Sequence, residues 1–143
     1  MSFKIVPAVK TTKFLYNIKE LLYFNFNKIY SLKYYNDIYF RNFIFNYINT
    51  SKQLSLKLNY CHEITDVFVL NNIHTLDLSF CNNINDISAL KNVHTLYLRS
   101  CENITDISAL SNVHTLELDR CNNITDVSVF DKRKSINQLR LSS

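Results

Sequence analysis

The chain has no glycine, no tryptophan and one proline among its 143 residues. The missing glycine excludes several catalytic and nucleotide-binding motifs. The P-loop, the dinucleotide-binding fingerprint, the EF-hand calcium loop and the nucleophile elbow all need glycine where the backbone turns sharply or approaches a ligand. No serine–histidine–aspartate set and no pair of carboxylates stands apart from the repeats described below. We therefore expect a protein that is not an enzyme, with no catalytic residues and no cofactor.

Long apolar runs are missing as well. No stretch reaches the roughly 20 apolar residues that are needed to span a bilayer. Near the start of the chain, Lys4, Lys10, Lys13, Lys19 and Glu20 interrupt any apolar core of a secretory signal. Without such a signal, the four cysteines are expected to be reduced thiols in an intracellular protein, in the cytoplasm or, if the chain is viral, in the host cytoplasm.

The net charge of +4 is unevenly distributed. Residues 1–50 hold seven Lys and Arg against two Asp and Glu, a net of +5, whereas residues 51–143 hold nine against ten, a net of −1. The basic excess therefore belongs to the N-terminal part. A solvated basic face is the simpler interpretation of this excess, and binding to nucleic acid or to another acidic partner is the alternative.

One phrase is repeated four times between about Leu54 and Phe130. The four cysteines mark its period, because each lies twenty residues from the next, at positions 61, 81, 101 and 121. A fixed period of this length is typical of a stacked solenoid. One copy offers about seven apolar side chains, which is too few to offset the entropy of ordering twenty residues. The copies are therefore expected to fold only when they stack on one another.

Each copy divides into two halves. In the third copy, Leu96-Tyr97-Leu98 alternates apolar and polar residues, which predicts a short half-buried strand. From Ile104 onward the apolar residues recur every third position, which suits a 3₁₀ turn. An aspartate opens this second half in every copy, where it can accept the free N–H groups at a helical start. These aspartates are Asp66, Asp86, Asp106 and Asp126.

The pattern resembles a leucine-rich repeat of the short, cysteine-containing type. The resemblance rests, in the third copy, on Val93, Leu96, Leu98, Cys101, Ile104, Thr105 and Asp106. It implies an α/β solenoid, with parallel strands on a concave face and short helical segments behind them. The repeats would cover residues 51–143. The last one is incomplete, because Leu139-Arg140-Leu141 arrives three residues later than the period predicts.

Residues 1–50 have a different character. Thirteen aromatic residues fall between Phe14 and Ile48, and apolar residues recur at helical spacing over Leu15–Phe26 and over Ile29–Ile44. We expect two or three helices, with breaks near Asn25–Asn27 and near Asn36–Asp37. The simpler interpretation is a helical N-terminal cap, because the end of a solenoid exposes an apolar surface that must be covered.

The segment Ile29–Ile44 also resembles the second half of an F-box, although the Leu-Pro that opens that motif is absent. The resemblance implies a ubiquitin-ligase substrate receptor, in which residues 1–50 bind a Skp1-type adaptor and the repeats choose the target. The adaptor-binding residues would then be Leu32, Phe40, Arg41 and Ile44.

Two further series of side chains suggest metal or thiol chemistry. His74, His94 and His114 recur with the cysteines, but within a copy the histidine lies seven residues before the cysteine. Along an extended segment this separates them by roughly 20 Å, far beyond a ligand bond or a hydrogen bond. We therefore expect no metal site. The cysteines should be small core residues, and the histidines should bond to the adjoining turns.

The outward strand positions remain as a recognition surface. They vary between copies, and the candidate partner-binding residues are Asp77, Tyr97, Arg99, Glu117 and Asp119. Tyrosine and arginine are common anchors of interfaces, although Arg99 could simply pair with Asp119 across the strands. Four strands would give a face roughly 20 Å wide, so binding through it alone should be weak. The sequence thus predicts a protein–protein interaction module; the F-box receptor and a nucleic-acid-binding N-terminal part are the alternatives.

Overall fold

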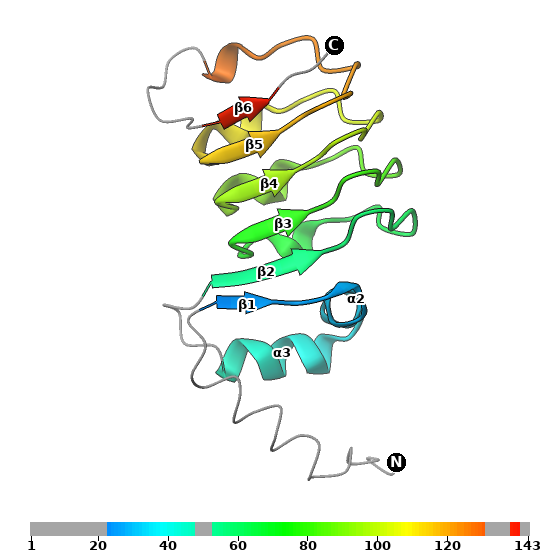
Figure 1. Cartoon of the computed structure of the whole chain (residues 1–143), viewed down its shortest axis with the longest axis vertical. Coiled ribbons are helices and arrows are strands. Elements are labelled where there is room, and N and C mark those ends of the chain that lie inside the picture. The colour runs from blue at the N-terminus through cyan, green and yellow to red at the C-terminus, as the bar shows by residue number, and fades with distance from the viewer. Residues whose placement is uncertain (1–22, 48–52, 131–137, 141–143) are drawn as a thin grey trace.

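The computed structural model describes residues 23–47, 53–130 and 138–140. Six strands form one parallel sheet whose spatial order follows the chain, and the crossovers that join the middle four strands lie behind the sheet (Figure 1). The strands are β1 (Tyr23–Asn25), β2 (Gln53–Lys57), β3 (Thr75–Asp77), β4 (Thr95–Tyr97), β5 (Thr115–Glu117) and β6 (Gln138–Arg140). Behind them lie four 3₁₀ helices, η1 (Phe68–Leu70), η2 (Ser88–Asn92), η3 (Ser108–Asn112) and η4 (Ser128–Phe130).

The twenty-residue period sets the register of the sheet. Leu56 pairs with Leu76, Leu76 with Leu96, and Leu96 with Leu116, so that each residue of a repeat meets its own counterpart. The last strand keeps this alignment even though the chain before it is longer. Leu139 pairs with Leu116, which is 23 residues earlier and not 20. The extra three residues predicted from the sequence are therefore taken up between η4 and β6.

The apolar positions of all repeats form one continuous core. The seven inward positions expected in the third copy are all buried, and so are the seven equivalent positions of the second copy, from Ile73 to Leu90. The third-position spacing that favoured a 3₁₀ turn is confirmed by η1 to η4. The structure is thus an α/β repeat arrangement in which parallel strands alternate with short helical turns.

Two α-helices, α2 (Lys28–Asn36) and α3 (Ile38–Tyr47), lie at the N-terminal end of the sheet (Figure 1). Asn27 starts α2 by accepting the Tyr30 N–H through Oδ1 at 3.1 Å. Asp37 breaks the chain between the helices and caps α3, because its Oδ1 accepts the N–H groups of Tyr39 and Phe40 at 2.9 and 3.0 Å. The two breaks expected from the sequence are therefore confirmed.

The helical spacing over Leu15–Phe26 was misleading at its C-terminal end. Tyr23–Asn25 is a strand that pairs with β2, and Phe26 is buried just after it. A partner strand at the sheet edge overrides the local pattern, because it satisfies the backbone groups while Phe26 still reaches the core. Leu15, Ile18, Leu21 and Leu22 lie outside the described residues.

The helices share the core of the repeats. Ile44 and Tyr34 belong to the same cluster of buried side chains as Leu54 and Leu56. The fully buried Ser31 joins the layers, because its hydroxyl donates to the Phe26 carbonyl at 3.3 Å and accepts the Lys57 N–H at 2.9 Å. Helix α2 is therefore bonded directly to β2 as well as packed against it.

A left-handed backbone turn recurs once in each repeat, directly before the cysteine. Tyr60, Phe80, Ser100 and Arg120 have φ angles of 60°, 64°, 54° and 60°. Glycine usually occupies such positions, since other residues bring Cβ too close to the backbone there. A chain without glycine therefore makes this turn four times with unfavourable residues.

Ser100→Gly should consequently stabilise the protein. Relief of the left-handed strain, about 1–2 kcal/mol, exceeds the entropy that glycine adds to the unfolded chain, about 0.4–1 kcal/mol. We expect a gain on the order of 0.5–1 kcal/mol in the free energy of unfolding, measured by urea denaturation. Ser111→Gly is the matched control, because Ser111 lies in η3 and is not among the residues with positive φ. The control should destabilise the protein, and a gain of the same size in both variants would contradict the account.

Candidate functional site

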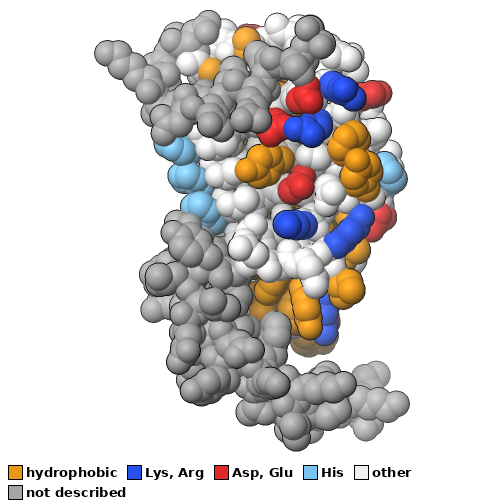
Figure 2. Space-filling view, in the orientation of Figure 1, with side chains coloured by type: hydrophobic (Ala, Val, Ile, Leu, Met, Phe, Trp, Pro, Cys, Tyr) orange, Lys and Arg blue, Asp and Glu red, His pale blue; other side chains and the backbone are white. Residues whose placement is uncertain are grey.

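The five residues predicted for partner binding lie together on the exposed side of the sheet. Asp77 pairs in register with Tyr97, and Tyr97 with Glu117, while the leucines between them point into the core. Arg99 and Asp119 follow two positions after Tyr97 and Glu117. We call Asp77, Tyr97, Arg99, Glu117 and Asp119 the sheet face. Figure 2 shows charged and hydrophobic side chains mixed over these strands.

Arg99 is held by two carboxylates of the neighbouring repeat. Its Nη2 donates to Glu117 Oε1, and its Nε lies 3.2 Å from Asp119 Oδ2. The side chain of Arg99 is 44% exposed, whereas that of Glu117 is only 12% exposed. The hydrogen bond to Glu117 raises the pKa of the guanidinium above its ordinary value, and the charge of that carboxylate adds to the effect.

This network fixes the sheet face before any partner arrives. Asp77 is fixed as well, because its Oδ1 accepts the Ser79 N–H at 3.0 Å. Such ion pairs near the surface contribute only about 0–1 kcal/mol each to stability. Their main effect is to keep the side chains of Arg99, Glu117 and Asp119 in one arrangement. Less side-chain entropy is then lost when a partner binds. The pairing of Arg99 with Asp119 that the sequence suggested is therefore present, with Glu117 as a second partner.

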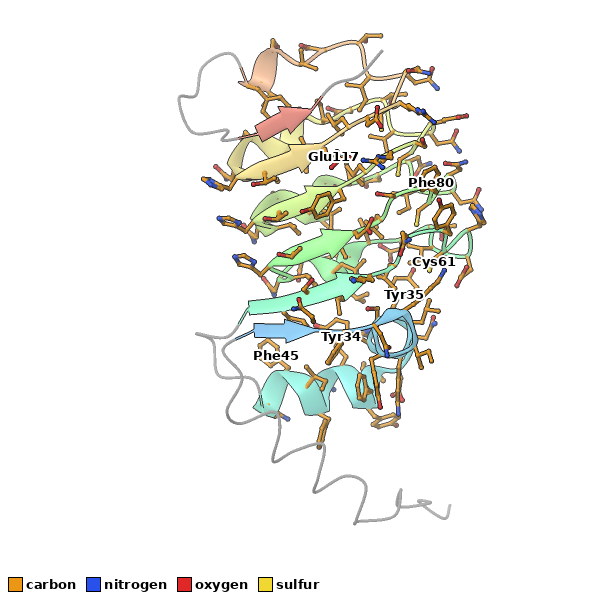
Figure 3. The ribbon with its side chains drawn as sticks, viewed as in Figure 1. Tyr34, Tyr35, Phe45, Cys61, Phe80 and Glu117 are labelled. Atoms are coloured by element: carbon orange, nitrogen blue, oxygen red, sulfur yellow. The ribbon has the colours of Figure 1, made fainter. Side chains whose placement is uncertain are left out.

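A second surface feature was not found from the sequence. The rings of Tyr60 and Phe80 stack with centroids 4.4 Å apart and planes 4° from parallel. Both residues occupy the left-handed turn, which follows the C-terminal end of each strand, where Figure 3 labels Phe80. The available signal was the residue before each cysteine, which is aromatic in two copies, serine in the third and arginine in the fourth.

The four cysteines are buried and free of disulfides. Three of them donate to a leucine carbonyl of the preceding repeat: Cys81 to Leu58 at 3.1 Å, Cys101 to Leu78 at 3.2 Å and Cys121 to Leu98 at 2.8 Å. Burial raises the pKa of the Cys81 thiol to about 11 and that of Cys101 to about 12. The core role expected for the cysteines is confirmed, and the bond to the adjacent repeat adds to it.

The three histidines form a stacked column that runs across the N-terminal ends of β3, β4 and β5 (Figure 2). The ring centroids of His74 and His94 lie 4.5 Å apart, and those of His94 and His114 lie 4.6 Å apart. Nδ1 of His74 lies 3.1 Å from the hydroxyl of Thr75, the next residue along the chain. The expectation that the histidines bond to adjoining turns was therefore wrong for this side chain, because the parallel register places ring on ring.

The aspartates behind the sheet act as predicted. Oδ1 of Asp66, Asp86, Asp106 and Asp126 accepts the N–H two residues later at 2.8 Å, where the 3₁₀ helix begins. At Asp86 the N–H of Ser88 and its hydroxyl both donate to the carboxylate. These two bonds lower the pKa of Asp86 below its ordinary value. Shallow open grooves lie between adjacent 3₁₀ helices, and these aspartates and neighbouring serines line them.

The residues proposed for adaptor binding lie in α2 and α3. Ile44 is 1% exposed, and Leu32 and Phe40 are partly buried against the core. Arg41 donates through Nη1 to the carbonyls of Tyr34 and Tyr35, both at 2.8 Å, at the C-terminal end of α2. The large apolar side chains exposed on these helices belong to other positions, namely Ile29, Tyr30, Ile38, Tyr39 and Phe45.

The basic side chains of α2 and α3 contact their own chain. Lys28 donates to the Asn59 carbonyl at 2.9 Å, and the Lys33 ammonium lies 4.8 Å from the centre of the Phe40 ring. Arg41 donates to the carbonyls of Tyr34 and Tyr35, as described above. The other lysines of residues 1–50, which are Lys4, Lys10, Lys13 and Lys19, lie outside the described residues.

Comparisons of the chain with protein-family models, with curated proteins and with solved structures give no match. Over residues 23–47, 53–130 and 138–140, no three histidine, cysteine, aspartate or glutamate side chains are grouped so that they could hold a metal ion. None of the helices in this part of the chain has the length and apolar character required to cross a membrane.

The buried thiols should react slowly in the native protein. At pH 8 they are protonated, because their pKa values are raised, and each must be exposed before a thiol reagent can reach it. We expect Ellman's reagent to modify all four within minutes in urea and only slowly without it. Ser111→Cys, which adds a partly exposed thiol on η3, should give one fast-reacting equivalent. Four fast equivalents in the native wild type would contradict this account.

The histidine column should make stability depend on pH. Burial lowers the pKa of His74 and His94 below 6.5, and the charge of the next imidazole lowers it further. Both rings therefore bind a proton more weakly in the folded chain than in the unfolded one. The free energy of unfolding should be greatest above pH 6.5 and should fall as the pH drops toward the lowered folded values.

Urea denaturation between pH 8 and pH 5 measures this dependence. His94→Gln removes the central ring and should flatten the profile. His62→Gln replaces an exposed histidine outside the column and should leave the profile unchanged. An equal slope in the wild type and in His94→Gln would show that other groups cause the dependence.

Proposed function

We propose that this chain is a protein–protein interaction module, a small leucine-rich-repeat solenoid that binds its partner through the sheet face. The observation that carries the proposal is the fixed arrangement of Arg99 between Glu117 and Asp119, with Tyr97 beside it in register with Asp77 and Glu117. Buried positions repeat the same residue types, whereas this exposed surface differs from one repeat to the next. Such variation suits recognition of a partner that does not itself repeat.

The chemistry of the sheet face supports a protein partner. Tyrosine supplies contact area at a small cost in side-chain entropy, and arginine and carboxylates supply directed hydrogen bonds. The six strands, spaced by about 4.8 Å, span about 29 Å, wider than the four expected from the sequence. The wider face allows a larger interface, although every strand except β2 is only three residues long.

Affinity capture with matched variants tests this function. Tyr97→Glu combined with Asp119→Lys changes the sheet face without altering a buried leucine. Lys91→Glu, on the exposed end of η2 behind the sheet, is the control. We expect at least one protein that the wild type and the control capture equally and that the double variant captures at least tenfold less. If the three chains capture the same proteins in equal amounts, the sheet face is not the binding surface.

A second candidate function is supported by the apolar side chains exposed on α2 and α3. Tyr39 is 77% exposed and Ile38 is 55% exposed, and a soluble surface rarely shows several such side chains on two adjacent helices. They would suit docking of a Skp1-type adaptor, as in an F-box substrate receptor. The docking residues would then be Ile38 and Tyr39, with Leu32, Phe40, Arg41 and Ile44 shaping the helices beneath.

A pull-down with the adaptor tests this candidate. Tyr39→Asp and Ile38→Asp should each abolish binding, whereas Asn42→Asp places the same charge at another exposed position of α3 and should not. No binding by the wild type, or equal loss in the three variants, would remove the F-box function and leave the sheet-face proposal intact.

A further inference from the structure

The left-handed turns create a column of four side chains beside the sheet face. Tyr60, Phe80, Ser100 and Arg120 occupy equivalent positions, twenty residues apart, with φ angles between 54° and 64°. Equal backbone geometry at equivalent positions gives their Cβ atoms a common direction. The first two rungs of this column are already filled by stacked rings, whose centroids are 4.4 Å apart.

Stability alone does not account for these two aromatic residues. A bulky side chain at positive φ is a genuine outlier, whereas asparagine or glycine would be tolerated there. Tyr60 is also 54% exposed, so it does not complete the core. Strained residues of this kind cluster at binding sites, which makes the column a candidate for recognition.

The third position of this column carries no ring, and we call it the gap. Ser100 ends at its hydroxyl, so the column has no aromatic side chain between Phe80 and Arg120. The repeat spacing of about 4.8 Å between strands separates Phe80 from Arg120 by about two rungs, which is the room that one planar ring needs to stack on both sides. Arg120 is exposed, and none of its side-chain atoms forms a hydrogen bond or ion pair within the described part of the chain.

We propose that this gap accepts an aromatic side chain of a bound peptide, which would stack on Phe80 and lie beneath the guanidinium of Arg120. The ring would continue the existing column, with an aromatic contact on one side and a cation–π contact on the other. The inference rests on the proposed function and names the anchor by which a partner is held at the edge of the sheet face.

The surrounding charges select a peptide with basic neighbours. The sheet face and the turns on either side of the cysteines hold four acidic side chains, Asp77, Glu117, Asp119 and Glu102, against the two basic side chains of Arg99 and Arg120 in the same three repeats. Two of the acids are already bonded to Arg99. The net of −2 attracts lysine or arginine next to the aromatic anchor and repels the phosphates that accompany a nucleobase.

Tryptophan fluorescence can follow binding directly, because the chain contains no tryptophan. The probe is the capped tripeptide acetyl-Lys-Trp-Lys-amide, titrated with the whole 143-residue chain. We expect a saturable change in its emission with a Kd on the order of 1 mM, as suits one buried ring with little further contact. Acetyl-Glu-Trp-Glu-amide should bind at least tenfold more weakly, because its charges oppose those beside the gap.

Variants of the column locate the binding site. Ser100→Phe places in the gap the side chain that Phe80 already carries at the equivalent position, and it should weaken binding at least tenfold. Phe80→Ser removes the stacking surface and should have a similar effect. Phe68→Ser is its matched control, because Phe68 is 67% exposed on η1 behind the sheet. Thermal unfolding of each variant confirms that it is folded.

Four results with the peptides and the variants would overturn the inference. They are no saturable binding of the lysine peptide, equal binding of the two tripeptides, equal binding to the wild type and Ser100→Phe, and equal loss in Phe80→Ser and Phe68→Ser. Tighter binding of oligothymidylate, lost in Ser100→Phe, would also overturn it by assigning the gap to nucleobases. Failure here is distinguishable from failure of the proposed function, because Tyr97→Glu with Asp119→Lys can still lose captured proteins when the gap binds no peptide.

Discussion

The parallel register of the strands is the constraint on which the other features depend. Because Leu76 pairs with Leu96 and Leu96 with Leu116, every side chain of a repeat lies next to the same position of the adjacent repeats. For leucine and isoleucine this produces a continuous apolar column. For polar residues the same rule places like beside like, which is unfavourable unless each member finds a partner of its own.

The polar columns meet this requirement through the backbone. Each aspartate behind the sheet accepts an N–H at the start of a 3₁₀ helix. The bonds from Ser108 lower the pKa of Asp106 below its ordinary value, even though the charges of Asp126 and Asp86 oppose this. Asn83, Asn103 and Asn123 donate through Nδ2 to carbonyls of the preceding repeat at 2.6, 2.5 and 2.7 Å. The thiols of Cys81, Cys101 and Cys121 do the same. The stack of repeats is therefore stabilised by hydrogen bonds between adjacent repeats as well as by burial of apolar side chains.

The surface has greater freedom, because exposed side chains are not constrained by packing in the core, and it is here that the repeats differ. The sheet face carries Asp77, Tyr97 and Glu117 at one equivalent position, and the left-handed column carries two aromatic residues, a serine and an arginine. These two surfaces follow one another along each repeat, since the strand leads directly into the turn. A partner that contacts the carboxylates and Arg99 therefore lies close to the gap at Ser100.

The sequence by itself determined the repeat. The cysteine period, the alternation around Leu96 and the third-position spacing after Ile104 gave the strands, the 3₁₀ turns, the buried set and the displaced last strand, because all of these follow from local periodicity. It also placed the helix breaks at Asn27 and Asp37, whose side chains cap the neighbouring turns.

Only the tertiary structure decided the contacts between segments distant in the chain. Pairing with β2 turned Tyr23–Asn25 into a strand, and burial against the repeats left Ile44 inside while Tyr39 remained exposed. The stacked histidines and the double pairing of Arg99 arise where one repeat meets the next. A single copy of the pattern contains neither interaction, because both require side chains of two repeats that strand pairing brings close together.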